Sequence, residues 1–568
     1  MKKSINRCAF VFILLFVTVS TLLGQAKTIK GNVVDENNEP LIGVSVFAVG
    51  TKSGTITDNV GNFSLDASVN SKLQFTYIGF EPKTLVVGNQ SIYKVQLVSS
   101  TAALNEIVVV GYGNVKKADL TGSVSSIKAA DLNTSATASL GNMMRGKAAG
   151  LSITQNSAKP GGGLNISIRG QKTPLYIVDG IMQTSFSKLS SNSIYDGGKN
   201  ESQLIGLNPE DIESIDVLKD ASSTAIYGAD AAGGVIIITT KKGKATAGEK
   251  VEVSYTGSSS LQYLSDVPQF LTAKDFMIEQ NKVLYELDNS VGLYSRHSQD
   301  KINNFVGNGT NWMNEVTRIG LINEHNLSIR SGTEKTQYLA SMSYYDNQGV
   351  AKNNSFNRIT GRINLDQKFN KWLKGGLNTT FASITYEDVP LGDSRQEKSA
   401  LIYSALTFNP LVPVYDENGN YSDNPDRPIY ANPVSLLDIT DETKNNNLIA
   451  NAYLQLDLFK GFFIKATAGI DNRTINTNQY IPRSTKSGAE RNGIASKNNG
   501  INQMITTNVL ANYNNTFSKI HTIGVMAGVE YRKNSWEGTY VTASDFPTDS
   551  PLWNNLQSSQ QDKPYLNS

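Results

Sequence analysis

The chain has 568 residues, which is enough for several domains. Its 52 lysine and arginine residues nearly balance its 50 aspartate and glutamate residues, so the formal net charge is only +2. This balance gives neither the basic field that nucleic-acid binding requires nor an acidic tail.

Residues 1–26 have the pattern of a secretory signal peptide. Three basic residues occur within the first seven positions, and an apolar run follows over 9–23. Gly24 and Ala26 then supply the small side chains of a cleavage site. The run is short for a helix that crosses the ~30 Å hydrocarbon core, which argues against a membrane anchor. Cys8 is the only cysteine and lies in this segment, so the mature chain would have neither a disulfide nor a cysteine metal site.

Residues 27–100 are predicted to form a small β-sandwich. Short strand-like runs alternate with turn signals such as NNEP at 37–40 and NVGN at 59–62.

The next segment, 101–115, contains the sequence LNEIVVVGYG at 104–113, a β-branched run between two domains with no obvious hairpin partner. This segment also imitates a G-x-G phosphate loop, but Lys116 replaces the third glycine and no βαβ unit follows, so we reject a dinucleotide site.

Residues 116–245 are predicted to form a compact α+β domain. We expect helices over 138–149 and 222–227, and a further helix that begins at Asn208-Pro209, where proline and acidic residues suit a helix start. Strands are expected at 164–169, 175–178, 215–218 and 234–241.

From 246 to 568 apolar and polar residues alternate over long segments. Alanine and leucine alternate with polar residues over 450–458, a Lys460-Gly461 turn follows, and the alternation resumes over 462–470. Such segments reach the ~9–11 residues that a strand needs to cross a bilayer, with one face toward lipid and one toward a wet lumen. A soluble β-sandwich is the alternative, but its strands average only ~5–6 residues.

Taken in order, these features resemble the SusC-type (SusC/RagA) TonB-dependent receptors. Residues 31–65 are similar to the carboxypeptidase-regulatory-like module, and LNEIVVVGYG is similar to the TonB box. NISIRG at 165–170, LYIVDG at 175–180 and the segment 207–243 are similar to the plug. Residues 229–234 depart from the family, which usually has a basic residue and an asparagine there. The resemblance implies a mostly β fold: the regulatory-like β-sandwich, an α+β plug and a transmembrane antiparallel β-barrel.

Two sets of site residues follow from the resemblance. The TonB box, which would bind TonB, comprises Glu106, Ile107, Val108, Val109, Val110, Gly111 and Tyr112. The plug motif comprises Arg169, Gly170, Asp179, Gly180, Lys219, Asp220, Tyr227 and Gly228.

The implied function is active import of a large nutrient across a Gram-negative outer membrane, with oligosaccharides favoured over peptides. TonB, ExbB and ExbD would supply energy, a SusD-type lipoprotein would act as a lid, and the barrel would contact outer-membrane lipid. No cofactor or nucleic acid is implied. Aromatic residues in loops are candidates to stack on sugars, although aromatics also form barrel girdles; they are Tyr294, Trp312, Tyr415 and Tyr421.

Enzyme chemistry has little support in the sequence. His297, His325 and His521 lie outside metalloprotease spacing, and the carboxylates are scattered. The sequence DENGN at 416–420 resembles a calcium loop only loosely, so we expect a β-turn. A secreted adhesin, a secreted hydrolase and a receptor that signals to an anti-sigma factor remain as alternatives; the signalling receptor would need a different extra N-terminal domain.

The barrel is expected to be incomplete. Plugged outer-membrane transporters use about 22 strands, whereas roughly ten segments satisfy the alternation criterion here. The chain ends on a polar, turn-like stretch at 557–568. Half a barrel would leave two sheet edges unpaired in lipid, so we expect that this length alone would neither insert nor transport.

Overall fold

The chain forms two compact units, Met1–Leu120 and Thr121–Ser568. The computed structural model describes residues 27–36, 38–49, 54–77, 80, 82–98, 107–110, 113–116, 123–132, 139–155, 159–172, 174–183, 204–245, 250–265, 267–286, 297–390, 400–518, 521–562 and 564–567. Within these ranges, no helix combines the length and the apolar character needed to span a membrane.

The predicted β-sandwich of the first unit is confirmed. One sheet has the strand order β4-β1-β7 and the other has the order β3-β2-β5-β6. Alternate side chains point into a shared core, in which Phe63 and Phe75 meet edge to face at 5.3 Å between ring centroids. The strands are β1 (Lys27–Val34), β2 (Ser45–Ala48), β3 (Gly54–Ile56), β4 (Asn62–Ala67), β5 (Lys72–Thr76), β6 (Lys83–Val86) and β7 (Ile92–Gln96).

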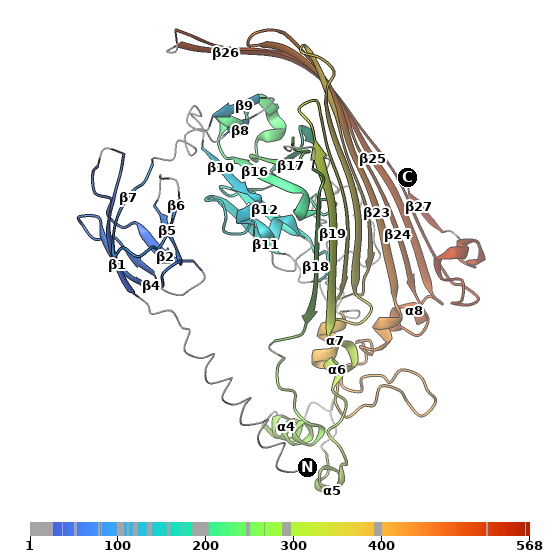
Figure 1. Cartoon of the computed structure of the whole chain (residues 1–568). Helices are drawn as coiled ribbons and strands as arrows, with labels where there is room; N and C mark the ends of the chain where they lie inside the picture. The colour runs from blue at the N-terminus through green and yellow to red at the C-terminus, as the bar shows by residue number, and fades with distance from the viewer. Residues whose placement is uncertain are drawn as a thin grey trace, which may run out of the picture. The chain divides into compact units, whose positions relative to one another are not determined.

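The second unit begins with an α+β domain made of two sheets (Figure 1). A five-stranded sheet has the order β10-β16-β17-β14-β15, and a three-stranded sheet has the order β11-β12-β13. The strands are β10 (Val124–Lys128), β11 (Leu151–Gln155), β12 (Leu164–Ile168), β13 (Gln171–Lys172), β14 (Leu175–Val178), β15 (Ile181–Met182), β16 (Ile212–Leu218) and β17 (Val235–Thr240).

The helices of this domain are shorter than predicted. The helix expected over 138–149 is limited to α2 (Leu140–Met143), because the chain turns at Gly146 and Gly150, whose φ angles of +75° and +78° are left-handed. The helix expected from Asn208 is one 3₁₀ turn, Pro209–Asp211, before β16 begins. The helix expected over 222–227 consists of α3 (Ala221–Thr224) and a 3₁₀ segment, Ala225–Ala231. A further 3₁₀ turn covers Ala129–Asp131.

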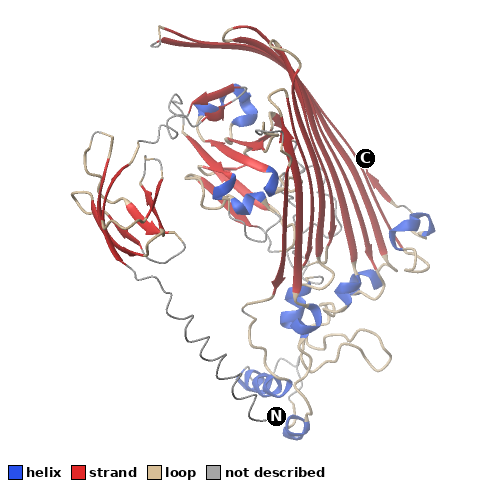
Figure 2. Ribbon diagram, in the orientation of Figure 1, coloured by secondary structure: helices blue, strands red, loops and turns tan. Residues whose placement is uncertain are grey.

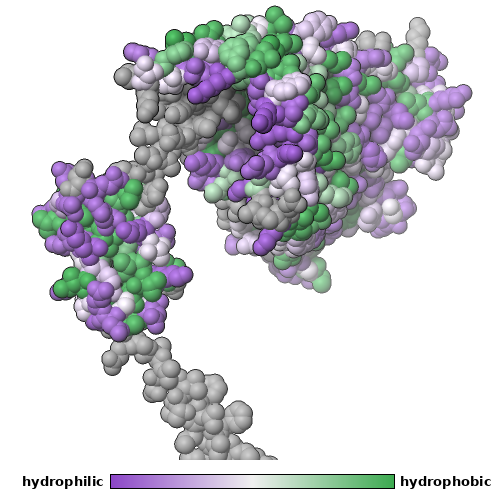
Figure 3. Space-filling view, turned by 45° about the horizontal axis from the view of Figure 1, so that its top comes forward, coloured by the Kyte–Doolittle hydropathy of each residue, from purple (hydrophilic) through white to green (hydrophobic). Residues whose placement is uncertain are grey.

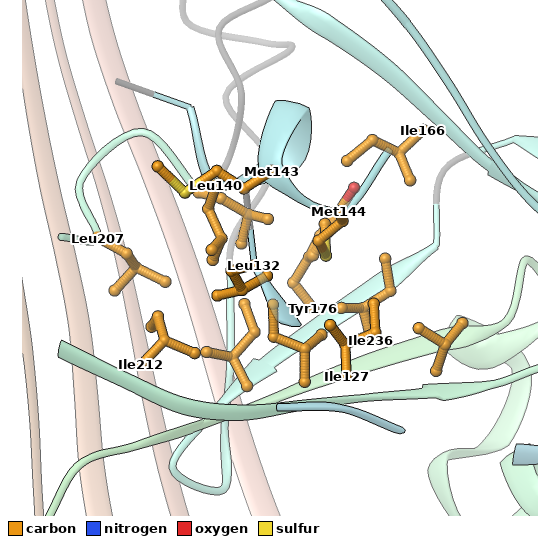
Figure 4. Close-up of a cluster of buried hydrophobic side chains, with 14 of the residues drawn as sticks. Ile127, Leu132, Leu140, Met143, Met144, Ile166, Tyr176, Leu207, Ile212 and Ile236 are labelled. Carbon is orange, nitrogen blue, oxygen red and sulfur yellow. The ribbon is translucent and has the colours of Figure 1, made fainter. Parts of the chain in front are cut away.

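A buried apolar cluster holds this domain together (Figure 4). Leu140 and Met144 come from the short helical segment, while Tyr176 and Ile236 come from neighbouring strands of the five-stranded sheet. Ile449, from a strand of the large sheet described next, belongs to the same cluster. The domain and the large sheet therefore share part of one core.

The rest of the second unit is dominated by one ten-stranded antiparallel sheet, in which each strand pairs with the next along the chain (Figure 2). This agrees with the roughly ten segments that satisfy the alternation criterion. The strands are β18 (Glu252–Gln262), β19 (Gly320–Gly332), β20 (Thr336–Gln348), β21 (Ser355–Lys368), β22 (Leu373–Glu387), β23 (Thr440–Phe459), β24 (Phe462–Ile481), β25 (Ile494–Phe517), β26 (His521–Ser544) and β27 (Tyr565–Asn567).

The two ends of the sheet differ. At one end the strands are joined by short turns, of which those at 333–335, 369–372 and 460–461 are fully described. The predicted Lys460-Gly461 turn is among them, and Gly461 has a φ of +85°. At the other end lie longer connections, which carry α4 (Ala273–Glu286), α5 (Gln299–Asn304), α6 (Trp312–Val316), α7 (Leu401–Thr407), α8 (Lys486–Ala489) and the 3₁₀ helices Ser435–Asp438 and Leu552–Ser558.

The two faces of the sheet also differ, as the alternation predicted. On β23 the polar side chains Thr443, Asn445 and Asn447 are buried, whereas Leu448 and Leu454 are exposed. Hydrophobic side chains are visible over the strands in the space-filling view (Figure 3). We call the face with buried polar residues the inner face and the opposite, apolar face the outer face.

Candidate functional site

The predicted TonB box lies in a small hairpin. Strand β8 (Ile107–Val110) pairs antiparallel with β9 (Gly113–Lys116) in a separate two-stranded sheet. The expectation that this segment lacks a hairpin partner is therefore wrong: two residues connect the strands, a length that favours hairpin pairing. Glu106, Gly111 and Tyr112 lie outside the described residues. Within the described part of the chain, β8 has a strand on one side only, which leaves its other edge available for strand addition.

The first plug-motif pair, Arg169 and Gly170, forms a tight turn between β12 and β13. Their φ angles of +50° and +82° are the left-handed pair that a two-residue hairpin turn of type I′ requires. The side chains of Arg169 and Lys219 both approach Gly150. The Lys219 ammonium donates to the carbonyl of Ala149 at 2.8 Å, and burial together with the nearby Arg169 charge lowers the pKa of Lys219. These residues organise the domain's own loops.

The second pair, Asp179 and Gly180, forms the same kind of turn after β14, with φ angles of +48° and +87°. The Asp179 carboxylate accepts a hydrogen bond from the backbone N–H of Thr240 at 3.0 Å and lies 3.4 Å from the guanidinium of Arg362 on β21. Arg362 also donates to the Thr240 hydroxyl. The carbonyl of Asp179 accepts from the Asn451 side chain of β23 at 3.2 Å. This turn therefore fixes the α+β domain to the inner face of the sheet.

Asp220 is the N-cap of α3. Its carboxylate accepts from the backbone N–H of Ser223 at 3.0 Å and from the backbone N–H of Ser123. These hydrogen bonds to the charged form, led by the one from Ser123, lower the pKa of Asp220 to about 2. The residue ties the helix start to the segment that precedes β10, which is a structural role.

Tyr227 and Gly228 mark a bend. Tyr227 is buried, and Gly228 adopts a φ of +65° that interrupts the helical segment. The segment 229–234, which departs from the family pattern, comes next in the chain. There Asp230 forms an ion pair with Arg532 of β26, a contact to the sheet that the sequence did not reveal.

Two further arginines of the inner face hold the α+β domain, and sequence reasoning did not identify either as a functional residue. Arg358 of β21 is fully buried, and its Nη1 donates to the carbonyls of Ile205 at 3.0 Å and Leu207 at 3.1 Å. Arg473 of β24 is 1 % exposed, and its Nη2 donates to the Gln183 side chain at 2.6 Å. The sequence did carry one indication. Both arginines occupy the alternate strand positions that hold polar side chains, and these positions share one face of the sheet.

We name Arg358, Arg362 and Arg473 the plug latch. All three are nearly or fully buried, and each binds the α+β domain from the wall of the sheet. Hydrogen bonds to charged groups contribute about 1.5–3 kcal/mol each, and leaving a buried partner unsatisfied costs a similar amount. The arrangement positions a folded domain firmly.

We expect Arg358→Met to loosen the domain without unfolding the sheet, because two carbonyls lose a charged donor while most of the buried volume is kept. The measurement is the entry of large antibiotics that intact outer membranes exclude; sensitivity should rise, as should cleavage of the α+β domain by added protease. Arg330→Met is the matched control, since Arg330 pairs with Glu252 within the sheet. Equal antibiotic sensitivity and equal cleavage in the two variants would contradict the role of Arg358 in holding the domain.

The aromatic residues expected in loops have different environments. Trp312 is only 3 % exposed; it packs on Phe408 at 4.6 Å between ring centroids and donates to the Asn409 carbonyl at 3.1 Å. The expectation that Trp312 stacks on sugar is therefore wrong, because packing between two long connections buries it. Tyr415 and Tyr421 stack on each other at 5.1 Å, and Tyr415 is about half exposed. Tyr294 lies outside the described residues.

The predicted turn at 416–420 is confirmed. The Asp416 carboxylate accepts from the backbone N–H groups of Asn418 at 2.9 Å and Asn420 at 2.8 Å, and Gly419 has a φ of +81°. A carboxylate that binds its own turn in this way is an Asx-type turn. Across the described ranges, no three His, Cys, Asp or Glu residues are grouped as metal ligands.

Comparison with known proteins agrees with this geometry. Residues 116–235 match the TonB-dependent Receptor Plug Domain family, and residues 29–109 match the CarboxypepD_reg-like domain family. Over its full length the chain is 31 % identical to TonB-dependent receptor P3 of Formosa agariphila, covering 54 % of that protein. Over 76 % of its length it is 34 % identical to TonB-dependent receptor SusC of Bacteroides thetaiotaomicron, covering 43 % of that protein.

Among solved structures, the RagAB peptide importer in its open-open state has a similar fold. The TM-score is 0.65 at 22 % identity, over 81 % of this chain and 53 % of the other. The chain spans about half the length of the curated relatives that it matches over most of its own length.

Proposed function

Because the chain belongs to the SusC-type TonB-dependent receptors, we propose that it provides the TonB box, the plug and part of the barrel of an active nutrient importer in the outer membrane. The observation that carries this proposal is the plug latch, which holds a whole folded domain on the inner face of a membrane-type sheet. A lumen closed in this way cannot pass a large solute until the domain moves. The protein moves its substrate and performs no chemistry on it.

We assign the following parts to this importer. Residues 1–26 form the signal peptide that directs export. Residues 27–100 form the regulatory-like sandwich and 101–115 the TonB box with its linker. Residues 116–245 form the plug, and 246–568 belong to the barrel.

Magnitudes explain why such an importer needs energy. A partner strand that pairs with the four residues of β8 gains about 0.5–1.5 kcal/mol per hydrogen bond, or a few kcal/mol in total. Each hydrogen bond of a latch arginine contributes about 1.5–3 kcal/mol, and three arginines of the latch must release the plug together. Binding of TonB to the box is therefore too weak to release the plug by itself. Work from the inner-membrane proton gradient, transmitted through ExbB, ExbD and TonB, would supply the difference.

Substrate enters from the side of the long connections, which face outward in barrels of this type. We propose an oligosaccharide as the cargo, on the basis of the family resemblance. Peptides are the second candidate, since the RagAB neighbour is described as a peptide importer. Uptake of fluorescent oligosaccharides and peptides by a deletion strain, with and without the restored gene, tests both. Restored uptake that stops when the proton gradient is dissipated is expected; uptake independent of the gene or of the gradient would contradict active import.

A SusD-type lipoprotein is proposed as the lid over the outer opening. Mild-detergent purification of the protein from its native host should then recover a surface lipoprotein in near-equal amounts. The lid would bind the long connections, such as the described residues 400–439, which carry α7 and its apolar contacts. Recovery of the importer alone, under conditions that keep other such pairs together, would contradict this partnership.

A further inference from the structure

The outer face of the ten-stranded sheet has a hollow over β23 and β24. Ala452 lies opposite Ala468. Two residues further along the same face, Leu454 lies opposite Ala466. On the neighbouring strand, Leu377 lies directly opposite Ala452. Three adjacent alanines beside leucines produce an apolar groove of about 550 Å³.

This groove lies on the side that faces away from the plug. Leu377 is 42 % exposed and Leu454 is 56 % exposed. Asn451 precedes Ala452 in the strand, so its side chain points to the opposite face. It is buried and donates a hydrogen bond to the carbonyl of Asp179 in the plug. Polar side chains of the inner face thus bind the plug, while the groove on the outer face presents apolar surface away from it.

One end of the groove is bordered by aromatic and cationic residues. Phe369, which lines the groove, belongs to the short turn 369–372 together with Lys371 and Trp372. The backbone N–H of Lys368 donates to the carbonyl of Lys335 at 2.7 Å, which brings the turn 333–335 alongside. Phe369 is 58 % exposed and Trp372 is 53 % exposed.

Positive charge dominates these two turns. Lys335 and Lys371 are both exposed, and Glu334 is the one carboxylate in the turns 333–335 and 369–372. Aromatic rings at the edge of an apolar surface mark the level of lipid headgroups, and clustered lysines at that level attract anionic lipids. An apolar groove that ends at such a border has the chemistry of a lipid with one charged end.

We propose that this groove binds an anionic phospholipid of the periplasmic leaflet. An acyl chain lies over Ala452, Ala466 and Ala468, and the phosphate lies near Lys371. The inference rests on the proposed function, because the groove meets lipid only in an outer-membrane barrel, whose short turns face the periplasm.

The test uses the protein purified in detergent and phospholipids with dibrominated acyl chains, since bromine quenches tryptophan fluorescence at short range. Trp372 reports on the border of the groove, and its contribution is the signal lost in Trp372→Phe. We expect dibrominated phosphatidylglycerol to quench Trp372 at lower concentrations than dibrominated phosphatidylcholine. Each lysine near an anionic headgroup contributes about a five-fold preference, so Lys371→Gln should remove most of the difference between the lipids.

A second variant tests the groove itself. Ala452→Leu/Ala468→Leu fills the hollow and should weaken quenching by both lipids. Ala340→Leu changes an exposed alanine on the outer face of β20 and should behave as the native protein does. Unaltered quenching in the filled variant, or equal quenching by both lipids in the native protein, would overturn the site. A protein that stays soluble without detergent would instead overturn the proposed membrane function.

Discussion

Val108→Pro is expected to abolish import while the protein remains folded in the outer membrane. Val108 lies inside β8, opposite Val115. Proline removes the N–H with which Val108 pairs to Val115 and fits poorly within a strand, so the hairpin would be disrupted and β8 would no longer offer an ordered edge for strand addition by TonB. Among the strands that the structure describes, the hairpin shares no sheet with the sandwich, the plug or the large sheet, so their cores should be unaffected.

Uptake of labelled substrate at matched protein levels in the outer membrane is the measurement. Val108→Ala is the control, because it shortens the side chain but keeps the N–H, and its import should stay near the native rate. Normal uptake by the proline variant would show that the segment 106–112 is not where TonB binds.

The face pattern of the large sheet was predictable from sequence because it depends on parity. Over 450–458 every second residue is apolar, and the structure exposes Leu454 while it buries Asn451. The turn at Lys460-Gly461 was also predictable, since glycine adopts left-handed φ angles without strain. Neither inference required knowledge of distant segments.

The latch was not predictable, because its partners are remote in sequence. Arg358 and Arg362 occupy the alternate positions of β21 that hold polar side chains, yet such a polar face also lines a water-filled lumen. Only the folded plug reveals that the Leu207 carbonyl meets Arg358 and that Asp179 meets Arg362. Trp312 failed as a prediction for the same reason, since Phe408 buries it from another connection.

The hairpin of the TonB box was missed although its signal is local. Two residues separate the strands β8 and β9, which is the commonest hairpin connection. The β9 sequence, GNVK, has one β-branched residue and little strand propensity. Pairing with β8 overrides that weak preference.

The plug must leave the wall for substrate to pass, and a disulfide can prevent this. A Cβ built on Gly206 of the plug would lie 3.8 Å from the Cβ of Asn447 on β23. Disulfides have a mean Cβ–Cβ separation near 3.8 Å, so Gly206→Cys/Asn447→Cys should cross-link with little movement. The mature chain proposed here contains no other cysteine that could compete.

The control joins two strands of the wall instead. Ser383 on β22 and Asn446 on β23 lie directly opposite each other, so Ser383→Cys/Asn446→Cys introduces a disulfide that does not touch the plug. Each single-cysteine variant reports the effect of substitution alone. All of these variants should import normally.

The decisive measurement is substrate uptake by cells that carry the Gly206→Cys/Asn447→Cys protein, before and after a membrane-permeable reductant. With the cross-link complete, uptake should fall to the level of a strain without the gene, and reduction should restore it. The wall-to-wall disulfide should leave uptake unchanged under both conditions. Native rates of uptake through the fully cross-linked protein would contradict the account, because they would mean that substrate passes while the plug stays bound to the wall.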